Sequence, residues 1–176
     1  MAAAYEAWLP ELNVRADLTA KRGIYVAKPD ARSLRIWLPA SGDLISGAVC
    51  RAMNRLNGTI LGRQAQHRWG PRAPRLSAMA WMERGKQTGS PHVHLLVERP
   101  LAFDQREFAE ALERAWRSQD ISHRECLIQA IEDNGASIRY NAKASSAMEN
   151  LVYFHKEPPE RAWWRQEALG RSSPGA

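Results

Sequence analysis

Two runs of strand-forming residues, 76–83 and 92–97, lie on either side of the segment RGKQTGS, which contains two glycines. A short connection of this kind favours a β-hairpin, because glycine readily adopts the backbone conformations that turns require. The second run carries His92 and His94, and residues two apart on a strand project from the same face. The sequence therefore predicts an antiparallel hairpin with two imidazoles side by side on one face.

A carboxylate on the first strand of this hairpin completes a set of metal ligands. If residues whose numbers add up to about 175 face each other, Glu83 lies opposite His92. Two imidazoles and one carboxylate leave positions open for water and a phosphate oxygen, which suits Mg²⁺ or Mn²⁺ acting as a Lewis acid. We therefore predict a divalent metal site formed by Glu83, His92 and His94. The alternative reading of the motif is a pair of half-exposed histidines that bind no metal.

A helix is predicted directly after the hairpin. Asp104 and Glu107 have the spacing of a capping box, so the helix begins there and runs to about residue 118. Apolar residues at helical spacing define its buried side. They are Phe108, Leu112 and Trp116.

Hydrophobic periodicity and turn residues predict the remaining elements. They are a strand at 33–38, a helix at 44–56, a strand at 126–131 and, after a turn at 133–135, one or two short helices that contain Tyr140 and Tyr153. The resulting order, βαββαβα, is typical of an α+β fold with helices packed on an antiparallel sheet, as in the ferredoxin-like or RNA-recognition sandwich. We expect one domain over residues 1–176, with its core at about 33–157 and flexible termini.

The charge distribution points to a polyanionic partner. The net charge is +6, and residues 1–88 hold 14 basic and 6 acidic side chains. Clustered arginines gain affinity for a phosphate backbone by releasing counterions. Six arginines near His67 and Trp69 are the candidate nucleic-acid-binding residues, although a solvated surface is an equally good reading. They are Arg51, Arg55, Arg63, Arg68, Arg72 and Arg75.

The cysteines and the hydropathy pattern predict the cellular compartment of the protein. Cys50 and Cys126 lie far apart and form no paired framework, which favours a reducing compartment. The chain has no apolar stretch long enough to span a bilayer. We expect a cytoplasmic protein with no membrane partner.

Three segments of the chain resemble the HUH endonucleases that initiate rolling-circle replication. These segments are WMERGKQTGSPHVHLLVERP, FDQREFAEALERAWRSQ and DNGASIRYNAK. The resemblance covers roughly residues 44–143. It implies a metal-dependent endonuclease that nicks and rejoins single-stranded DNA of a plasmid or phage through a 5′-phosphotyrosine intermediate. The implied partners are single-stranded DNA or an origin hairpin and a host helicase.

The same resemblance implies a tyrosine nucleophile in a YxxK motif, and the sequence has two. Tyr140 with Lys143 stands at the distance from the preceding strand that the family pattern has, so Tyr140 is our first choice. Tyr153 with Lys156 is the alternative nucleophile. A phenol is mostly protonated at neutral pH and needs activation by the cation or a base.

One departure from the family leaves other functions open. The family's first strand is rich in threonine, but the segment expected to represent it, SLRIWLP, has none. A non-catalytic protein that binds single-stranded or origin DNA and keeps only a vestigial site is therefore an alternative. A cupin-like metal oxygenase is another, because His92, His94 and Glu98 have the spacing HxHx₃E. A cupin, however, is an all-β barrel, and the capped helix after the motif argues against it.

Overall fold

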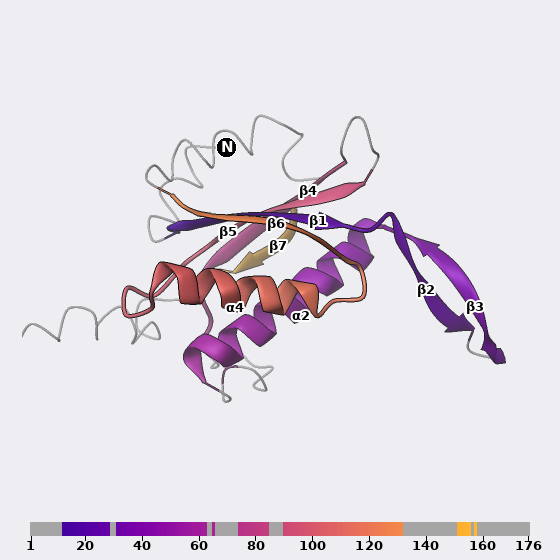
Figure 1. Ribbon diagram of the computed structural model, residues 1–176, viewed down its shortest axis with the longest axis horizontal. Coiled ribbons are helices and arrows are strands. Elements are labelled where there is room, and N and C mark those ends of the chain that lie inside the picture. The colour runs from indigo at the N-terminus through magenta and orange to yellow at the C-terminus, as the bar shows by residue number, and fades with distance from the viewer. Residues whose placement is uncertain are drawn as a thin grey trace, which may run out of the picture.

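The computed structural model describes residues 12–28, 31–62, 65, 74–84, 90–131, 151–155 and 157. Within them the chain forms seven strands and two helices (Figure 1). In chain order these are β1 (Val14–Ala20), β2 (Gly23–Lys28), β3 (Ala31–Pro39), α2 (Gly42–Leu61), β4 (Ala78–Arg84), β5 (Pro91–Val97), α4 (Gln105–Arg117), β6 (Ser122–Ala130) and β7 (Leu151–His155). The fold is α+β, as the sequence predicts.

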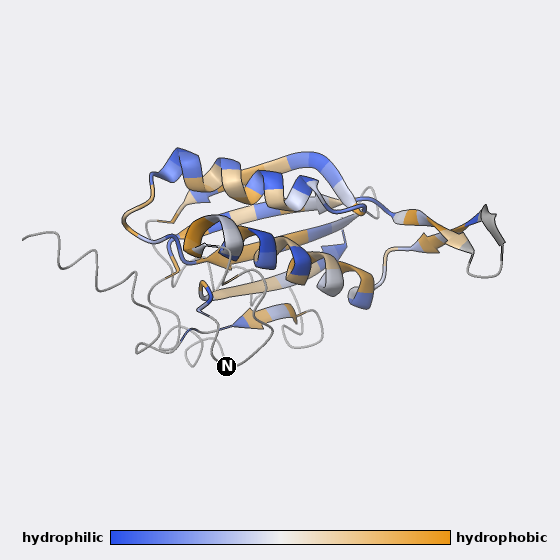
Figure 2. Ribbon diagram, turned by 90° about the horizontal axis from the view of Figure 1, so that it is seen from below, coloured by the Kyte–Doolittle hydropathy of each residue, from blue (hydrophilic) through white to orange (hydrophobic). Residues whose placement is uncertain are grey.

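Five of the strands form one antiparallel sheet in the order β6-β1-β5-β4-β7. The helices α2 and α4 lie together on one face of this sheet (Figures 1 and 2). The other two strands, β2 and β3, pair only with each other and project away from the body of the molecule. The structure therefore consists of a sheet layer, a helix layer and a separate two-stranded ribbon.

The larger of two clusters of buried apolar residues fills the space between the sheet and the two helices. Strand β1 alternates buried and half-buried residues along its whole length, so one side of the strand faces the core. Helix α4 begins at Asp104, whose carboxylate accepts from the backbone N–H groups of Arg106 and Glu107. Its predicted apolar side is confirmed, because Phe108 and Trp116 are fully buried. Burial of a side chain this large contributes roughly 1.5–3 kcal/mol.

The predicted hairpin, both predicted helices up to residue 118 and the predicted strand at 126–131 are confirmed. Helix α2 extends beyond the predicted residues 44–56 at both ends, and the Ser41 side chain caps it by accepting from the Leu44 N–H. Strand β6 covers the predicted strand at 126–131 except its last residue. These elements carry strong local signals, which explains why they could be predicted.

Three predictions about the fold are wrong. The order βαββαβα leaves out β1 and β2, so the folded core begins well before residue 33. The segment SLRIWLP does form strand β3, but it lies in the ribbon and not in the main sheet. Tyr153 lies on a strand, β7, where a helix was expected. The turn at 133–135 and Tyr140 lie outside the described residues.

Neither helix among the described residues is long and apolar enough to cross a membrane.

Candidate metal site on the face of the sheet opposite the helices

The two histidines of the HxH motif lie next to each other on β5, as predicted. Val93 and Leu95 alternate with them and are buried in the core beneath the helices. His92 and His94 therefore project from the opposite face of the sheet. We call the face that carries them the histidine face.

Glu83 reaches this face from the neighbouring strand β4. The register pairs Glu83 directly with His92, so the predicted sum of 175 is correct. The carboxylate of Glu83 also extends diagonally to the other histidine, with Oε2 3.1 Å from Nε2 of His94. The three predicted ligands are thus brought together on adjacent strands.

Strand β1, on the other side of β5, places a side-chain oxygen across from each histidine. Asp17 is the cross-strand partner of His94, and Thr19 is the partner of His92. Oδ1 of Asp17 lies 2.6 Å from Nδ1 of His94, and Oγ1 of Thr19 lies 3.4 Å from Nδ1 of His92. Both contacts involve Nδ1, so β1 contacts the same edge of both rings.

These two oxygens were not predicted from the sequence. The segment VRADLTA alternates apolar and polar residues, which is the signal of a half-buried strand. That signal places Asp17 and Thr19 on one face, but it does not identify the partner strand. Only the fold shows that β1 lies beside the histidines.

An ionic hydrogen-bond network joins the side chains around His94. Its hydrogen bond with Asp17 raises the pKa of His94 above the usual value, and Glu83 adds to this effect against the opposing effect of burial. Burial favours a higher pKa for Asp17, but the hydrogen bond with His94 and the charge of Arg15 outweigh it and lower the pKa. Arg15 also forms an ion pair with Asp17, with Nη2 2.9 Å from Oδ2. The ring of His94 therefore lies between two carboxylates, which favour its protonated form.

The donor set fits a divalent cation, although the side chains are not arranged around one. Among the described residues, no group of three or more His, Cys, Asp or Glu side chains converges as ligands of an ion. The reason is local, because Glu83 and Asp17 both bond to the ring of His94. Imidazole nitrogens and carboxylate oxygens suit Mn²⁺, and carboxylate and water oxygens suit Mg²⁺. The exposed fractions, 17% for His94 and 43% for Glu83, leave both side chains within reach of ions in solvent.

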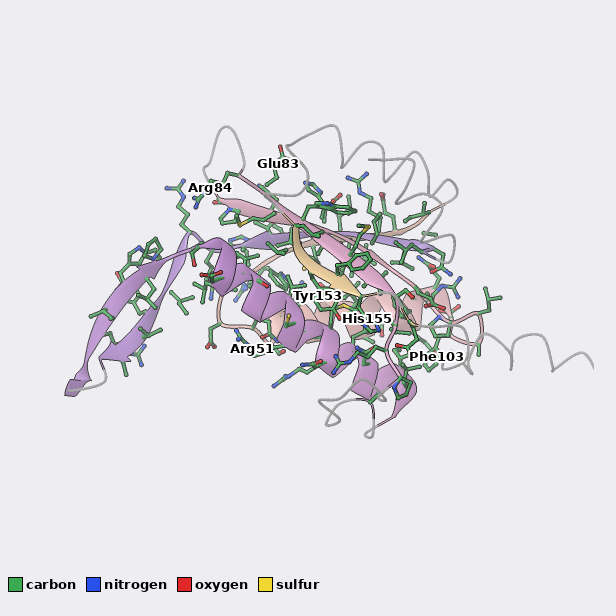
Figure 3. The ribbon with its side chains drawn as sticks, turned by 180° about the vertical axis from the view of Figure 1, so that it is seen from behind. Arg51, Glu83, Arg84, Phe103, Tyr153 and His155 are labelled. Atoms are coloured by element: carbon green, nitrogen blue, oxygen red, sulfur yellow. The ribbon has the colours of Figure 1, made fainter. Side chains whose placement is uncertain are left out.

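Tyr153 lies on the opposite face of the sheet from the histidines. It pairs with Ala80 on β4, and both pack against the core beneath the helices. Figure 3 shows Tyr153 between the sheet and helix α2, whereas Glu83 points away on the other side. Burial raises the pKa of Tyr153 to about 12. The structure therefore does not bring this tyrosine to the metal ligands.

The first-choice nucleophile, Tyr140, and its lysine, Lys143, lie outside the described residues, as does Lys156.

Three of the six arginines predicted to bind nucleic acid, Arg51, Arg55 and Arg75, lie within the described residues. Arg51 and Arg55 are exposed on helix α2, which lies on the opposite side of the sheet from the histidines, and Figure 3 labels Arg51 there. Arg51 donates from Nε to Oε1 of Gln119, 3.1 Å away. Arg75 donates from Nη1 to Oδ1 of Asn54 on α2, 2.7 Å away. The other three arginines, Arg63, Arg68 and Arg72, lie outside the described residues.

The cupin-like ligand Glu98 is also not at the site. It lies after the end of β5 and is 3% exposed, and its Oε2 accepts from the backbone N–H of Ser77. Six residues of extended chain place it roughly 20 Å along the strand from His92. The carboxylate therefore cannot share an ion with the histidine pair, and the open five-stranded sheet is not a cupin barrel.

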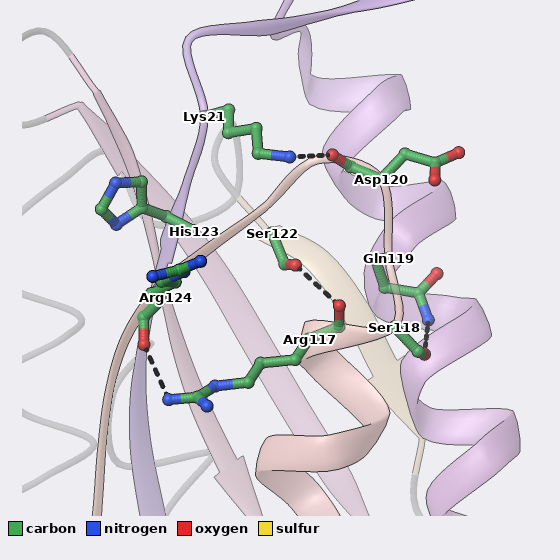
Figure 4. A pocket seen from close by; sticks show the side chains of 8 residues that line it. All are labelled: Lys21, Arg117, Ser118, Gln119, Asp120, Ser122, His123 and Arg124. Carbon is green, nitrogen blue, oxygen red and sulfur yellow. Dashed lines mark hydrogen bonds between the residues drawn. The ribbon is translucent and has the colours of Figure 1, made fainter.

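A polar hollow of about 630 Å³ borders the end of β1 that pairs with His92, and Figure 4 shows the side chains that line it. It lies between the end of β1 and the loop that follows α4. Lys21 donates to the carbonyl of Asp120, 2.8 Å away, and Arg117 donates to the carbonyl of Arg124, 3.1 Å away. These bonds connect the loop to β1 and β6 and occupy part of the donor capacity of both cations. The remaining lining residues are Ser118, Gln119, Ser122 and His123.

Comparison of the chain with known protein families, with curated proteins and with solved structures found no match.

Proposed function

We propose that this protein is a metal-dependent single-strand DNA endonuclease of the HUH type, which nicks and rejoins DNA to initiate rolling-circle replication of a plasmid or phage. One observation carries the proposal. His92, His94 and Glu83 project together from one face of an antiparallel sheet, and an oxygen from β1 contacts each histidine. Metal-binding histidines generally donate their second N–H to such an oxygen.

The side chains have separable roles in this proposal. His92, His94 and Glu83 hold Mg²⁺ or Mn²⁺, which polarises the scissile phosphate when it is bound. Asp17 accepts the Nδ1–H of His94 and thereby keeps Nε2 as the coordinating nitrogen. Thr19 orients the ring of His92 in the same way. For His94 to coordinate, the Nε2 proton that it shares with Glu83 must leave.

Tyr140 is the proposed nucleophile. Its phenol oxygen bonds to phosphorus while the bond from phosphorus to the 3′ oxygen breaks. The phenol loses its proton to solvent, and the leaving 3′ oxygen takes one up, so the products are a 5′-phosphotyrosine and a free 3′-hydroxyl. Lys143 stabilises the negative charge that develops. The placement of Tyr153 on the other face of the sheet supports the choice of Tyr140 over Tyr153 for this role.

The proposed partners are single-stranded DNA or an origin hairpin and a host helicase, and the proposed location is the cytoplasm. One observation favours the non-catalytic alternative, in which the protein binds DNA without cleaving it. Both nitrogens of His94 already bond to carboxylates, so the network is also complete without a cation.

A covalent-adduct assay tests the proposal. The protein is incubated with a pool of labelled single-stranded oligonucleotides that includes candidate origin hairpins and Mn²⁺, with and without chelator. It is then analysed on denaturing gels and by intact mass spectrometry. We expect a chelator-sensitive adduct that Tyr140→Phe abolishes and Tyr153→Phe preserves. An adduct on Tyr153 would contradict the assignment of the nucleophile, and DNA binding without any adduct would favour the non-catalytic alternative.

A further inference from the structure

The β2–β3 ribbon projects from the body of the molecule (Figures 1 and 2). It carries large apolar side chains that are exposed to solvent. In a monomeric protein such side chains are normally scattered, and a contiguous group of them marks a site of interaction. Four of the five large apolar side chains have an exposed fraction of 38% or more, and the fifth, the half-buried Val26, lies next to Tyr25. The five are Tyr25, Val26, Ile36, Trp37 and Leu38.

The register of the ribbon divides its side chains between two different faces. Tyr25 pairs with Trp37 and Ala27 pairs with Arg35, so these residues share one face, which we call the aromatic face. The opposite face carries aliphatic pairs, Ile24 with Leu38 and Val26 with Ile36. The two faces therefore present different chemistry to a partner.

The two rings of the aromatic face are exposed and in contact. Their centroids are 4.9 Å apart with an angle of 58° between the planes, and 63% of Tyr25 and 47% of Trp37 remain exposed. A methyl group at Gly23 would collide with the indole of Trp37 and with the carbonyl of Leu38. The indole thus packs against the glycine backbone on one side and the tyrosine ring on another. The two rings therefore form one continuous aromatic surface.

Positive charge accompanies the rings. Residues 21–39 contain five basic side chains and one acidic side chain. Arg35 is exposed two residues from Trp37 on the aromatic face, and the exposed Lys21 and Arg22 lie where the ribbon joins the body. Exposed rings beside cations are the chemistry of surfaces that bind single-stranded nucleic acid, in which bases stack on the rings and phosphates meet the cations. A protein partner would not require this excess of positive charge.

We propose that the aromatic face of the β2–β3 ribbon binds single-stranded DNA, with bases stacked on Tyr25 and Trp37 and a phosphate held by Arg35. The proposal rests on the proposed function only for the choice of DNA as the polymer. It adds a binding surface outside the histidine face. Every base can stack on an aromatic ring, so we expect this surface to bind the strand without selecting its sequence.

The test is a binding measurement in which cleavage cannot occur. Fluorescence anisotropy in EDTA follows a labelled oligothymidylate about twenty nucleotides long. The double variant Tyr25→Ala/Trp37→Ala removes both rings, and the matched control Ile36→Ala/Leu38→Ala removes apolar bulk from the other face. Both variants change a ribbon that lies outside the main sheet, and circular dichroism checks that each is folded. We expect the first variant to bind at least about tenfold more weakly than the control.

Two further readouts are specific to the contacts. Arg35→Gln should make the plot of log affinity against log salt concentration less steep by about 0.7, which is the contribution of one phosphate contact on a single strand. Photocrosslinking of an oligonucleotide that carries 5-iododeoxyuridine should label Tyr25 or Trp37, as identified by peptide mass spectrometry.

Two results would overturn the proposal: no binding of the oligothymidylate by the wild-type protein, or equal affinities of the two double variants. A separate result shows whether the proposed endonuclease activity is wrong. A protein that forms no adduct with Mn²⁺ but loses oligothymidylate binding when the rings are removed would refute the nickase and support the ribbon proposal.

Discussion

Nδ1 of His94 donates a hydrogen bond to Oδ1 of Asp17 over 2.6 Å, and the two residues are direct cross-strand partners on β5 and β1. The backbone pairing therefore fixes which edge of the imidazole meets the carboxylate. The other edge, with Nε2, is directed at Glu83. In this arrangement Asp17 is a positioning residue, because it acts on a bound cation only through the ring of His94.

Removal of Asp17 should weaken metal binding. Without the carboxylate, the ring of His94 loses the partner that fixes its tautomer, and loss of such partners typically costs 10–100-fold in metal affinity. Titration of Mn²⁺ followed by electron paramagnetic resonance should therefore give a dissociation constant roughly 10–100-fold higher for Asp17→Ala. Asp17→Asn should lie between it and the wild type, because the amide oxygen still accepts from Nδ1.

The matched control is Asp43→Ala, which removes an exposed carboxylate from the first turn of α2 on the helix side of the sheet. Its Mn²⁺ affinity should equal that of the wild type. If Asp17→Ala also binds Mn²⁺ like the wild type, the histidine pair is not the metal site or Asp17 does not position it.

Glu83→Gln should lower the affinity for Mn²⁺ more than Asp17→Asn does. The amide keeps the size of the side chain but loses the charge, so it neither attracts a divalent cation nor serves well as its ligand. We expect Mn²⁺ affinity below that of Asp17→Asn and no covalent adduct with DNA. Glu110→Gln, on the exposed side of α4, is the control and should change neither measurement. Equal metal binding by both glutamine variants would show that Glu83 is not a ligand.

The sequence predicts the hairpin and its chemistry because both are local. Strands β4 and β5 are joined by a short connection, so the numbers of paired residues add up to a constant, and Glu83 could be placed opposite His92 in advance. No such constraint links β1 to β5, which lie more than seventy residues apart along the chain. Asp17 and Thr19 could therefore be assigned to a strand face, but not to the histidines.

Tyr153 illustrates a different kind of error. Our prediction places Tyr153 on a short helix, whereas Leu151, Val152 and Phe154 around it favour the pleated surface of a sheet. Strand β7 then pairs with β4, and the register turns the tyrosine toward the core. A pattern of four residues does not specify which face of the protein it occupies.

The raised pKa of Tyr153 predicts a specific loss of stability in alkali. An unfolded phenol ionises near pH 10, whereas burial raises the pKa of Tyr153 to about 12 in the folded protein. Between these values the folded state binds more protons, so stability is lost as the pH rises above 10, by up to about 1.4 kcal/mol per pH unit. Tyr153→Phe removes this titration. Urea unfolding at several pH values should therefore show a shallower alkaline decline for the variant, and parallel declines would contradict the burial.

Glu157 should be a major contributor to the stability of the β7 edge. Its side chain is fully buried, and Oε2 accepts from the backbone N–H of Arg75 at 3.0 Å and from Nε2 of His155 at 2.8 Å. The backbone N–H of Glu157 donates to Oγ of Ser77, so the residue joins the chain after β7 to the segment before β4. Glu157→Ala leaves buried donors without this acceptor, which should lower the free energy of unfolding by roughly 1–3 kcal/mol.

Thermal unfolding and amide hydrogen exchange measure this loss. The exchange of residues 151–155 should accelerate more than that of β1 or β5, because β7 is an edge strand of the sheet. Glu113→Ala is the control, since its carboxylate pairs with Arg117 on the surface of α4 and such pairs contribute little. If the two variants unfold at the same temperature, Glu157 does not anchor the edge, and the position of β7 must depend on the packing of its side chains against α2 instead.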